Sequence, residues 1–434
     1  MNRKIIGLLL LAGLITIGCI AAGCTDMPQT TSGQADPPAG QETPAQDSEG
    51  VGNVSAGNNR FAFDLYRQIA GDPGSAGKNI FFSPYSISSA LAIAYEGARG
   101  ATGDEIGSVL HLPQNETLRR AGFAGLDAVL NNGDENYTLR TANALWAEET
   151  YSFRPDYVDT AARWYSANVT NLDFANDAEA SRQTINRWVE EKTEDKIRDL
   201  LPAGSIDAMT RLVITNAVYF KGTWVKQFDP AETTEEEFRV APGETVRVPM
   251  MHRTDEDAIY GYAETGTLQV LRMPYAHADG TELSMLVLLP REDNLTAAEE
   301  ALDPGTLTEI RDSMTDRRVR VIFPKFTLET EYSLSPVLAA MGMPTAFSGD
   351  ADFAGMDGTD RLFISEVFHK AFVDVNEEGT EAAAATGVVM NIKSAPGGDT
   401  TPVFRADHPF VFLIVEEDSG TVLFAGRVAN PESA

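Results

Sequence analysis

The stretch from Asn376 to Ser394 reads NEEGTEAAAATGVVMNIKS and has no pattern of a catalytic site. Two glutamates and Gly379 lead into four alanines, and an apolar run then ends at Lys393 and Ser394. Alanine favours a helix and glycine opposes it, so composition alone allows a short exposed helix or a linker. The preceding residues, KAFVDV, alternate apolar and other side chains as a strand does. That alternation allows a second interpretation.

An extended conformation would give this stretch two faces, because side chains alternate along a strand. One face would carry only small residues, namely Thr380, Ala382, Ala384 and Thr386. The other face would carry Glu381, Ala383 and Ala385. Gly379, just before them, would supply a turning point. A segment of this kind is able to slip between existing strands without a steric clash.

The whole chain is long, acidic and almost free of cysteine. It has 434 residues, of which 43% are hydrophobic, and 64 acidic against 34 basic residues give a formal charge of −30. This balance argues against nucleic-acid binding, because phosphate contacts need clustered Lys and Arg. The two cysteines are Cys19 and Cys24. A disulfide scaffold, a cysteine metal site and a cysteine nucleophile are therefore excluded from the body of the protein.

The N-terminus has the pattern of an export signal. Two basic residues precede the apolar stretch Ile5–Ile20, and small residues follow up to Cys24. The pattern resembles a lipoprotein signal, in which the cysteine is lipidated and becomes the first mature residue, although Ala21 stands where leucine is usual. Ordinary cleavage nearby and an uncleaved anchor are the alternatives. We expect a signal peptide over 1–24, export to the cell surface or beyond, and a membrane tether through Cys24.

The next segment, 25–57, is rich in Pro, Gly, Ser, Thr and Gln and contains acids but no base. Such a composition buries too little apolar surface to fold, so it predicts a disordered acidic linker. The folded body is expected over 58–434.

The body begins with helical patterns. Residues Phe61, Leu65 and Ile69 recur on one face of a helix, and so do Ile185 and Val189 further along. A helix is also predicted from Pro84, with Ser83 as its cap and Gly97 and Gly100 closing it; Ser83 and Pro84 suit these positions.

Strand patterns dominate the rest of the body. They are expected over Arg211–Phe220, Leu283–Pro290, Arg318–Phe326, Phe410–Glu417 and Thr421–Val428, and the last two are expected to pair. Helices dominate the first third and strands the remainder. This order predicts an α+β fold with antiparallel sheets rather than alternating β-α-β units.

Signatures of catalysis are missing from the sequence. The five histidines do not have a short metal-ligand spacing, and there is no nucleophile elbow, phosphate loop or dinucleotide fingerprint. We therefore expect no metal and no cofactor, and a binding or inhibitory protein rather than an enzyme. A hydrolase with an unrecognised site is the alternative.

The segment EEGTEAAAAT, Glu377–Thr386, resembles the hinge of inhibitory serpins, the serine protease inhibitors. The resemblance extends over the body, and further segments follow in serpin order: NIFFSPYSISSALA, ITNAVYFKGTW, ISEVFHKAFVDVNEEG, FRADHPFVFLI and LFAGRVANP. The lipoprotein-like start makes the chain similar to an exported prokaryotic member.

This resemblance implies three mostly antiparallel β-sheets, about eight or nine helices and an exposed reactive-centre loop. The shutter positions would be Ser83, Ser86, Asn216 and His369, and Trp224 would lie at the breach. Lys325 matches a position that can pair with the acid at the start of the hinge. The hinge itself would comprise Glu377, Glu378, Gly379, Thr380, Glu381, Ala382, Ala383, Ala384, Ala385 and Thr386.

The family mechanism implies a function. A protease would cleave the loop as a substrate, and the freed hinge would insert into the large sheet and trap the acyl-enzyme; serpin loop insertion is a known case of strand addition and of released strain. The family spacing from Gly379 to the cleaved bond falls on Lys393–Ser394, which favours trypsin-like proteases. Met390–Asn391 and Ile392–Lys393 are alternative bonds. The partner is then a serine protease bound by a monomer, and a non-inhibitory serpin with a binding, storage or chaperone-like role is the alternative.

Overall fold

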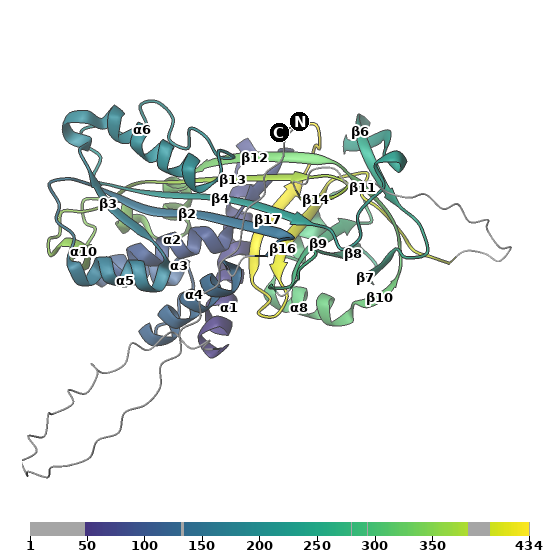
Figure 1. Cartoon of the computed structure of the whole chain (residues 1–434), viewed down its shortest axis with the longest axis horizontal. Helices are drawn as coiled ribbons and strands as arrows, with labels where there is room; N and C mark the ends of the chain where they lie inside the picture. Colours follow the sequence, from purple (N-terminus) through teal and green to yellow (C-terminus); the bar gives the residue numbers. More distant parts are fainter. Residues whose placement is uncertain (1–47, 132–133, 279, 293, 381–399, 434) are drawn as a thin grey trace, which may run out of the picture. The chain divides into compact units, whose positions relative to one another are not determined.

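The computed structural model describes residues 48–131, 134–278, 280–292, 294–380 and 400–433 (Figure 1). Within these residues the chain forms ten α-helices and three β-sheets, which confirms the predicted α+β class. The helices are α1 (Ser48–Ala70), α2 (Pro84–Gly97), α3 (Gly100–Val109), α4 (Glu116–Leu130), α5 (Pro155–Tyr165), α6 (Phe174–Lys192), α7 (Thr296–Glu300), α8 (Pro304–Ser313), α9 (Ser335–Met341) and α10 (Ala354–Asp357). Two of them, α7 and α10, are single turns of five and four residues; the longer helices agree with the expected number.

The three sheets are mostly antiparallel. The first has seven strands in the order β1 (Ile80–Phe82), β17 (Val422–Val428), β16 (Phe410–Glu416), β9 (Leu283–Pro290), β8 (Leu268–Pro274), β7 (Ile259–Glu264) and β10 (Thr315–Arg318). The second has four, in the order β15 (Val403–Arg405), β11 (Arg320–Pro324), β6 (Glu244–Arg253) and β5 (Thr234–Ala241). The third has six, in the order β12 (Phe326–Ser333), β13 (Ile364–Val375), β14 (Gly379–Thr380), β4 (Leu212–Thr223), β2 (Tyr137–Glu148) and β3 (Asn168–Leu172).

The six-stranded sheet has an unusual centre. Strands β4 and β13 run parallel and pair directly, with Asn216 opposite His369. At the end that lies on the right in Figure 1, β14 stands between them and pairs antiparallel with both. There Thr380 lies opposite Val375 on one side and Gly222 on the other. We call the boundary between β4 and β13 the seam.

Each face of this sheet is covered by apolar side chains. Helix α6 lies on one side and α2 and α5 on the other (Figure 1). On the α6 side, Phe174 and Val189 pack in one cluster with Trp146 of β2 and Ala217 of β4. The opposite face, including Val218 and Phe220, belongs to the larger core. A strand that entered the seam would therefore be buried on both faces.

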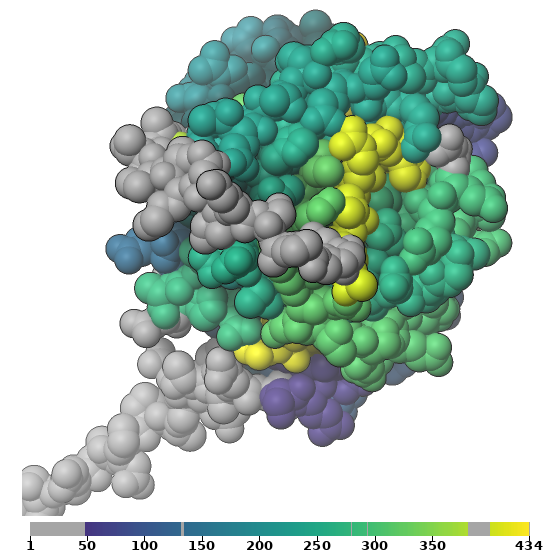
Figure 2. All heavy atoms as spheres, turned by 90° about the vertical axis from the view of Figure 1, so that its right-hand side faces the viewer, coloured from purple at the N-terminus to yellow at the C-terminus, as the bar shows by residue number. Residues whose placement is uncertain are grey.

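The four-stranded sheet lies at the end of the molecule that Figure 2 faces. The yellow C-terminal segment that contains β15 is visible there between teal and green atoms. Strand β15 pairs parallel with β11, with Val403 opposite Arg320. The described chain therefore stops at Thr380 inside one sheet and resumes just before the edge strand of another.

The sequence expectation of one strand over Arg318–Phe326 is wrong. The chain there contributes the end of β10, the whole of β11 and the start of β12, which belong to three different sheets. The residues have strand propensity throughout, but propensity does not specify a partner. The partner changes at Val319 and at Lys325, the residues between these strands.

Helix α1 begins at Ser48, within the segment that the sequence predicted to be linker. One of the glycines that suggested a linker, Gly50, lies where α1 packs against α4. A Cβ on Gly50 would stand 2.8 Å from the carbonyl oxygen of Leu118, and one on Gly122 would stand 2.3 Å from that of Gly50. Because the two backbones approach so closely, glycine is required there, and the packing offsets its low helix propensity.

Candidate functional site

The predicted shutter residues meet at the middle of the seam. Ser83 caps α2: its Oγ accepts a hydrogen bond from the backbone N–H of Ser86 at 3.2 Å and donates one to the carbonyl of Leu423 at 2.7 Å. The amide of Asn216 donates to Ser86 Oγ and to Asn143 Oδ1. The side chains of Ser83, Ser86 and Asn216 are buried. The cluster therefore joins α2 to β4 and, through Asn143, to β2.

His369 completes this cluster from the other side of the seam. The backbone N–H of Ser83 donates to its Nε2 at 3.1 Å, so Nε2 is an acceptor, and Nδ1 carries the proton that Asn216 Oδ1 accepts at 2.5 Å. Burial lowers the pKa of the imidazole to about 3. A proton on Nε2 would set two donors against each other, so His369 is a neutral structural residue rather than an acid catalyst.

The breach lies where β14 enters the sheet. Trp224 is buried, its ring stacks on Tyr275 at 4.5 Å, and its Nε1 donates to the carbonyl of Asn376 at 3.1 Å. The hydroxyls of Tyr275 and Thr380 share a 2.8 Å hydrogen bond. Burial raises the pKa of the Tyr275 hydroxyl, which therefore stays protonated. These contacts hold the first hinge residues against the sheet.

The start of the hinge is anchored by charge. Lys325 Nζ lies 2.8 Å from a carboxylate oxygen of Glu377, as expected from the sequence, and the hydroxyl of Thr233 donates to the other oxygen at 2.8 Å. Partial burial acts to raise the pKa of Glu377, but the hydrogen bonds from Lys325 and Thr233 lower it below its ordinary value. The backbone of Glu378 is bound as well, because its carbonyl accepts from the N–H of Trp224.

Glycine is needed at position 379 for a reason other than the turning point that the sequence suggested. Its φ is not in the left-handed range, but a Cβ there would stand 2.0 Å from the carbonyl oxygen of Gly222. Gly222 is crowded in turn, because its Cβ would stand 2.7 Å from the ring of Tyr275. The two glycines therefore let β14 approach β4 closely.

Several predicted site residues lie outside the described part of the chain. They are Cys24, Glu381, Ala382, Ala383, Ala384, Ala385, Thr386, Lys393 and Ser394. The described site also contains residues that sequence reasoning missed, namely Asn143, Gly222, Thr233 and Tyr275. Asn143 is only partly buried and lies in a strand that also contains Thr138, Arg140 and Thr141, so the sequence offered no signal for it.

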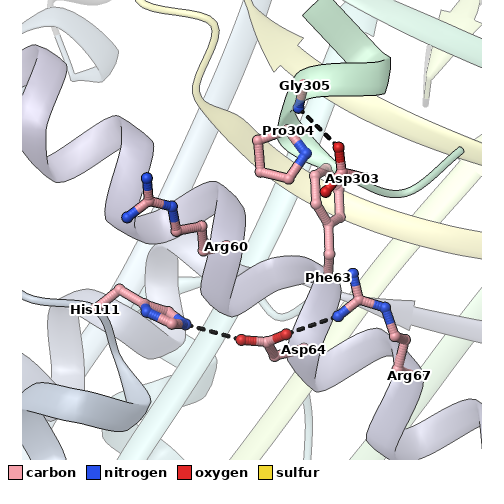
Figure 3. A pocket seen from close by; sticks show the side chains of 8 residues that line it. All are labelled: Arg60, Phe63, Asp64, Arg67, His111, Asp303, Pro304 and Gly305. Carbon is pink, nitrogen blue, oxygen red and sulfur yellow. Dashed lines mark hydrogen bonds and ion pairs between the residues drawn. The ribbon is translucent and has the colours of Figure 1, made fainter.

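A separate cavity of about 410 Å³ lies between α1, α8 and the segment after α3 (Figure 3). Asp64 lies between His111 and Arg67 and accepts a hydrogen bond from His111 at 2.8 Å and from Arg67 at 2.7 Å. Asp303 caps α8 through the N–H of Gly305 at 3.0 Å. The charged groups of this cavity join neighbouring elements. None of the described residues of the predicted site lines the cavity.

Neither a metal centre nor a membrane span is found in the part of the chain that the structure describes. No group of three or more His, Cys, Asp or Glu residues there is arranged to hold a metal ion. None of the helices there is both long and apolar enough to span a bilayer.

Sheet order, hinge and shutter together define the class of this protein, and the comparisons agree. The family model Serpin (serine protease inhibitor) matches residues 56–431. A serpin-like protein of Thermococcus kodakarensis is 44% identical over 377 residues, which cover 86% of this chain and 85% of that protein. The leukocyte elastase inhibitor of Bos taurus is 41% identical over 385 residues, which cover 87% of this chain and 99% of that protein. The chain belongs to the serpin family.

Solved structures show the same fold. Uncleaved ovalbumin superposes with a TM-score of 0.77 at 31% identity and covers 87% of this chain and 100% of its own. Human thyroxine-binding globulin superposes with a TM-score of 0.79 at 31% identity and covers 88% of this chain and 99% of its own. The family is one of serine protease inhibitors rather than catalysts, and it contains inhibitory members such as the leukocyte elastase inhibitors.

Proposed function

We propose that this protein inhibits trypsin-like serine proteases as a suicide substrate, cleaved at Lys393–Ser394. The observation that supports this most directly is β14, the two hinge residues that already lie between β4 and β13. They occupy the first position of a strand that cleavage of the loop would complete. The remaining residues of that strand are those after Thr380.

The register of the sheet supports insertion without sliding. Thr380 pairs with Gly222 on β4 and with Val375 on β13, and antiparallel partners step back one residue at a time. Continued in this register, Thr386 would meet Asn216 on one side and His369 on the other. Those two residues already lie opposite each other. The seam therefore has to open by one strand spacing, about 4.8 Å, while the register of its two strands stays unchanged.

The inward face of the inserted strand would fit the space. Thr380 is buried and contacts Tyr275, so every second residue after it would face the larger core. These are Ala382, Ala384 and Thr386. They would lie beside large neighbours such as Phe220 and Val373, which leave room for small side chains only. A charged residue on this face would be costly to bury.

The length of the seam supports Lys393 as the residue at the cleaved bond. Strand β4 begins at Leu212, which in the same register would meet Met390. Lys393 would then lie just beyond the end of the seam. Cleavage after Met390 would leave the attached protease level with Leu212, with no free residues to link it. A lysine at the bond suits a protease whose specificity pocket holds a carboxylate.

Incubation with trypsin tests the proposal. We expect a covalent complex that survives hot detergent, together with a C-terminal fragment that begins at Ser394, identified by mass. The variant Lys393→Ala should lose the complex with trypsin. Complete turnover of the loop without a stable complex would contradict inhibition and favour the non-inhibitory alternative.

We further propose that the protein is exported, tethered through lipidated Cys24 and monomeric. The basic start, apolar stretch and small residues before Cys24 support export and lipidation. In cells fed labelled fatty acid, the wild type should carry label in the membrane fraction, and Cys24→Ser should not. Light scattering should give the mass of one chain, and a larger mass would contradict the monomer.

A further inference from the structure

Met209 is the most exposed large apolar side chain in the part of the chain that the structure describes. Its exposed fraction is 69%, compared with 53% for Val225, 47% for Ile259 and 39% for Val403. A single exposed apolar side chain needs no explanation by itself. The position of Met209 relative to the seam supplies one.

The turn that carries Met209 is firmly held. The backbone N–H of Met209 donates to the carboxylate of Asp207 at 2.8 Å. The N–H of Asp207 donates to the hydroxyl of Thr210 at 2.9 Å, and the N–H of Thr210 donates to the carbonyl of Asp207 at 3.0 Å. The guanidinium of Arg211 donates to the carbonyls of Ala208 and Thr210. The turn therefore presents the methionine on a rigid support.

This turn is fixed to both sides of the seam. The backbone N–H of Arg211 donates to Ser365 Oγ of β13 at 2.9 Å, and the next residue, Leu212, opens β4. Met209 lies three residues before Leu212. It stands at the end of the seam opposite to β14.

The register brings the cleaved bond to the same end of the seam. Met390 would meet Leu212, the first residue of β4, in the inserted state, so Lys393 would lie just beyond the strand, on the side of the turn that carries Met209. A protease joined to Lys393 by an acyl bond would thus arrive at the turn over Asp207–Arg211. This step rests on the proposed function.

We propose that Met209 is a docking contact for the trapped protease, whose surface it supports once insertion is complete. The chemistry suits this partner. On the proposed mechanism, a protease held at the end of the seam would be distorted and would expose apolar side chains. Methionine is unbranched and polarizable, so it adapts to irregular apolar surfaces. The contact would slow the recovery of the active site and hence the release of the protease by hydrolysis of the acyl bond.

The test compares how fast covalent complexes with trypsin decay. The variants are Met209→Asp, Met209→Ser and, as a matched control, Ile259→Asp, which changes an exposed apolar residue on β7 of a different sheet. We expect the complexes of both Met209 variants to decay about tenfold faster than that of the wild type. A change of this size corresponds to the loss of a methionine side chain that the protease covers in the complex. The Ile259→Asp complex should decay at the wild-type rate.

Two further readings separate docking from insertion and from folding. Cleavage of the loop should raise the thermal midpoint of the Met209 variants as much as that of the wild type, since the variants leave the seam unchanged. Equal decay of all four complexes would overturn the docking contact and leave the proposed inhibition intact. Failure of the wild type to form any complex would overturn both.

Discussion

Nδ1 of His369 lies 2.5 Å from Oδ1 of Asn216, and this hydrogen bond joins β13 to β4 across the seam. Both side chains are fully buried. A strand that enters the seam must break the bond, because Thr386 would then stand between the two residues. The bond therefore holds the seam closed in the intact protein, and the first hinge residues, β14, lie at one end of the seam.

We predict that the intact protein loses stability as the pH falls below about 6.5, the ordinary pKa of histidine. The folded protein holds the pKa of His369 at about 3, so the unfolded chain binds the proton first. The stability that the neutral imidazole contributes is complete above about pH 6.5 and is lost as the pH falls toward 3. The full loss is on the order of 5 kcal/mol.

Nitrogen NMR of the imidazole measures this directly and separates it from the titration of carboxylates. We expect the His369 signals of the neutral form with the proton on Nδ1 to persist below pH 5. A His369 that titrates near pH 6.5 would contradict the buried network.

Loss of the hinge anchor should weaken the intact protein modestly. The variant Lys325→Met removes the ion pair with Glu377, and because Lys325 is 36% exposed we expect a cost of about 1 kcal/mol. The pKa of Glu377 is lowered by this contact, so the anchor's contribution is present above the ordinary pKa of a glutamate and is lost as the pH falls through the lowered value. Denaturant unfolding at pH 7 and pH 3 checks this: the difference between wild type and variant should shrink at pH 3.

The close crossing of α1 and α4 gives a pair of opposite predictions. Gly122→Ala places a methyl group 2.3 Å from the carbonyl oxygen of Gly50 and should destabilise the protein by roughly 1–3 kcal/mol. Gly52 lies in α1, as Gly50 does, but a Cβ at this position would meet no atom within 4 Å. Gly52→Ala should therefore stabilise the protein by roughly 0.5–1 kcal/mol. The denaturant midpoints of the two variants, compared with that of the wild type, check both predictions. If Gly52→Ala instead had no effect, residues near 52 would not be helical in solution.

A charge on the inward face should convert the inhibitor into a substrate. In the proposed inserted register Ala384 would lie between Val218 and Ala371, both buried in the core, so Ala384→Glu would have to bury a carboxylate. We expect trypsin to cleave this variant without forming a stable complex. Glu381→Gln, on the opposite face near the mouth of the seam, is the control and should inhibit as the wild type does. Equal yields of complex from the two variants would argue against insertion on this face.

The sequence supplied the class of fold and the residues at the centre of the site. Asn216, His369 and Trp224 were recognised from motifs, because each lies in a segment with a strong resemblance to the family. Asn143 and Tyr275 were missed because each becomes part of the site only in the folded protein. Folding brings Asn143 beside Asn216 and Tyr275 beside Thr380. Local pattern cannot supply a contact between residues so far apart in the chain.

Two other differences have the same origin. The run Arg318–Phe326 has strand propensity along its whole length, and only tertiary pairing divides it among three sheets. The glycines before Asn58 oppose a helix by propensity, and the close contact with α4 makes glycine favourable at Gly50. In both places tertiary packing outweighs local preference.

A cysteine pair tests the central claim, that cleavage places the hinge between β4 and β13 in the existing register. In a protein with Cys19→Ser and Cys24→Ser, the pair Ala385→Cys and Ala217→Cys lies directly opposite in the inserted state, whereas Ala385→Cys and Tyr219→Cys lies two residues out of register. After cleavage with trypsin and mild oxidation, we predict a disulfide in the first pair, detected by mass, and none before cleavage. No disulfide after cleavage, or one formed preferentially in the second pair, would contradict insertion in this register.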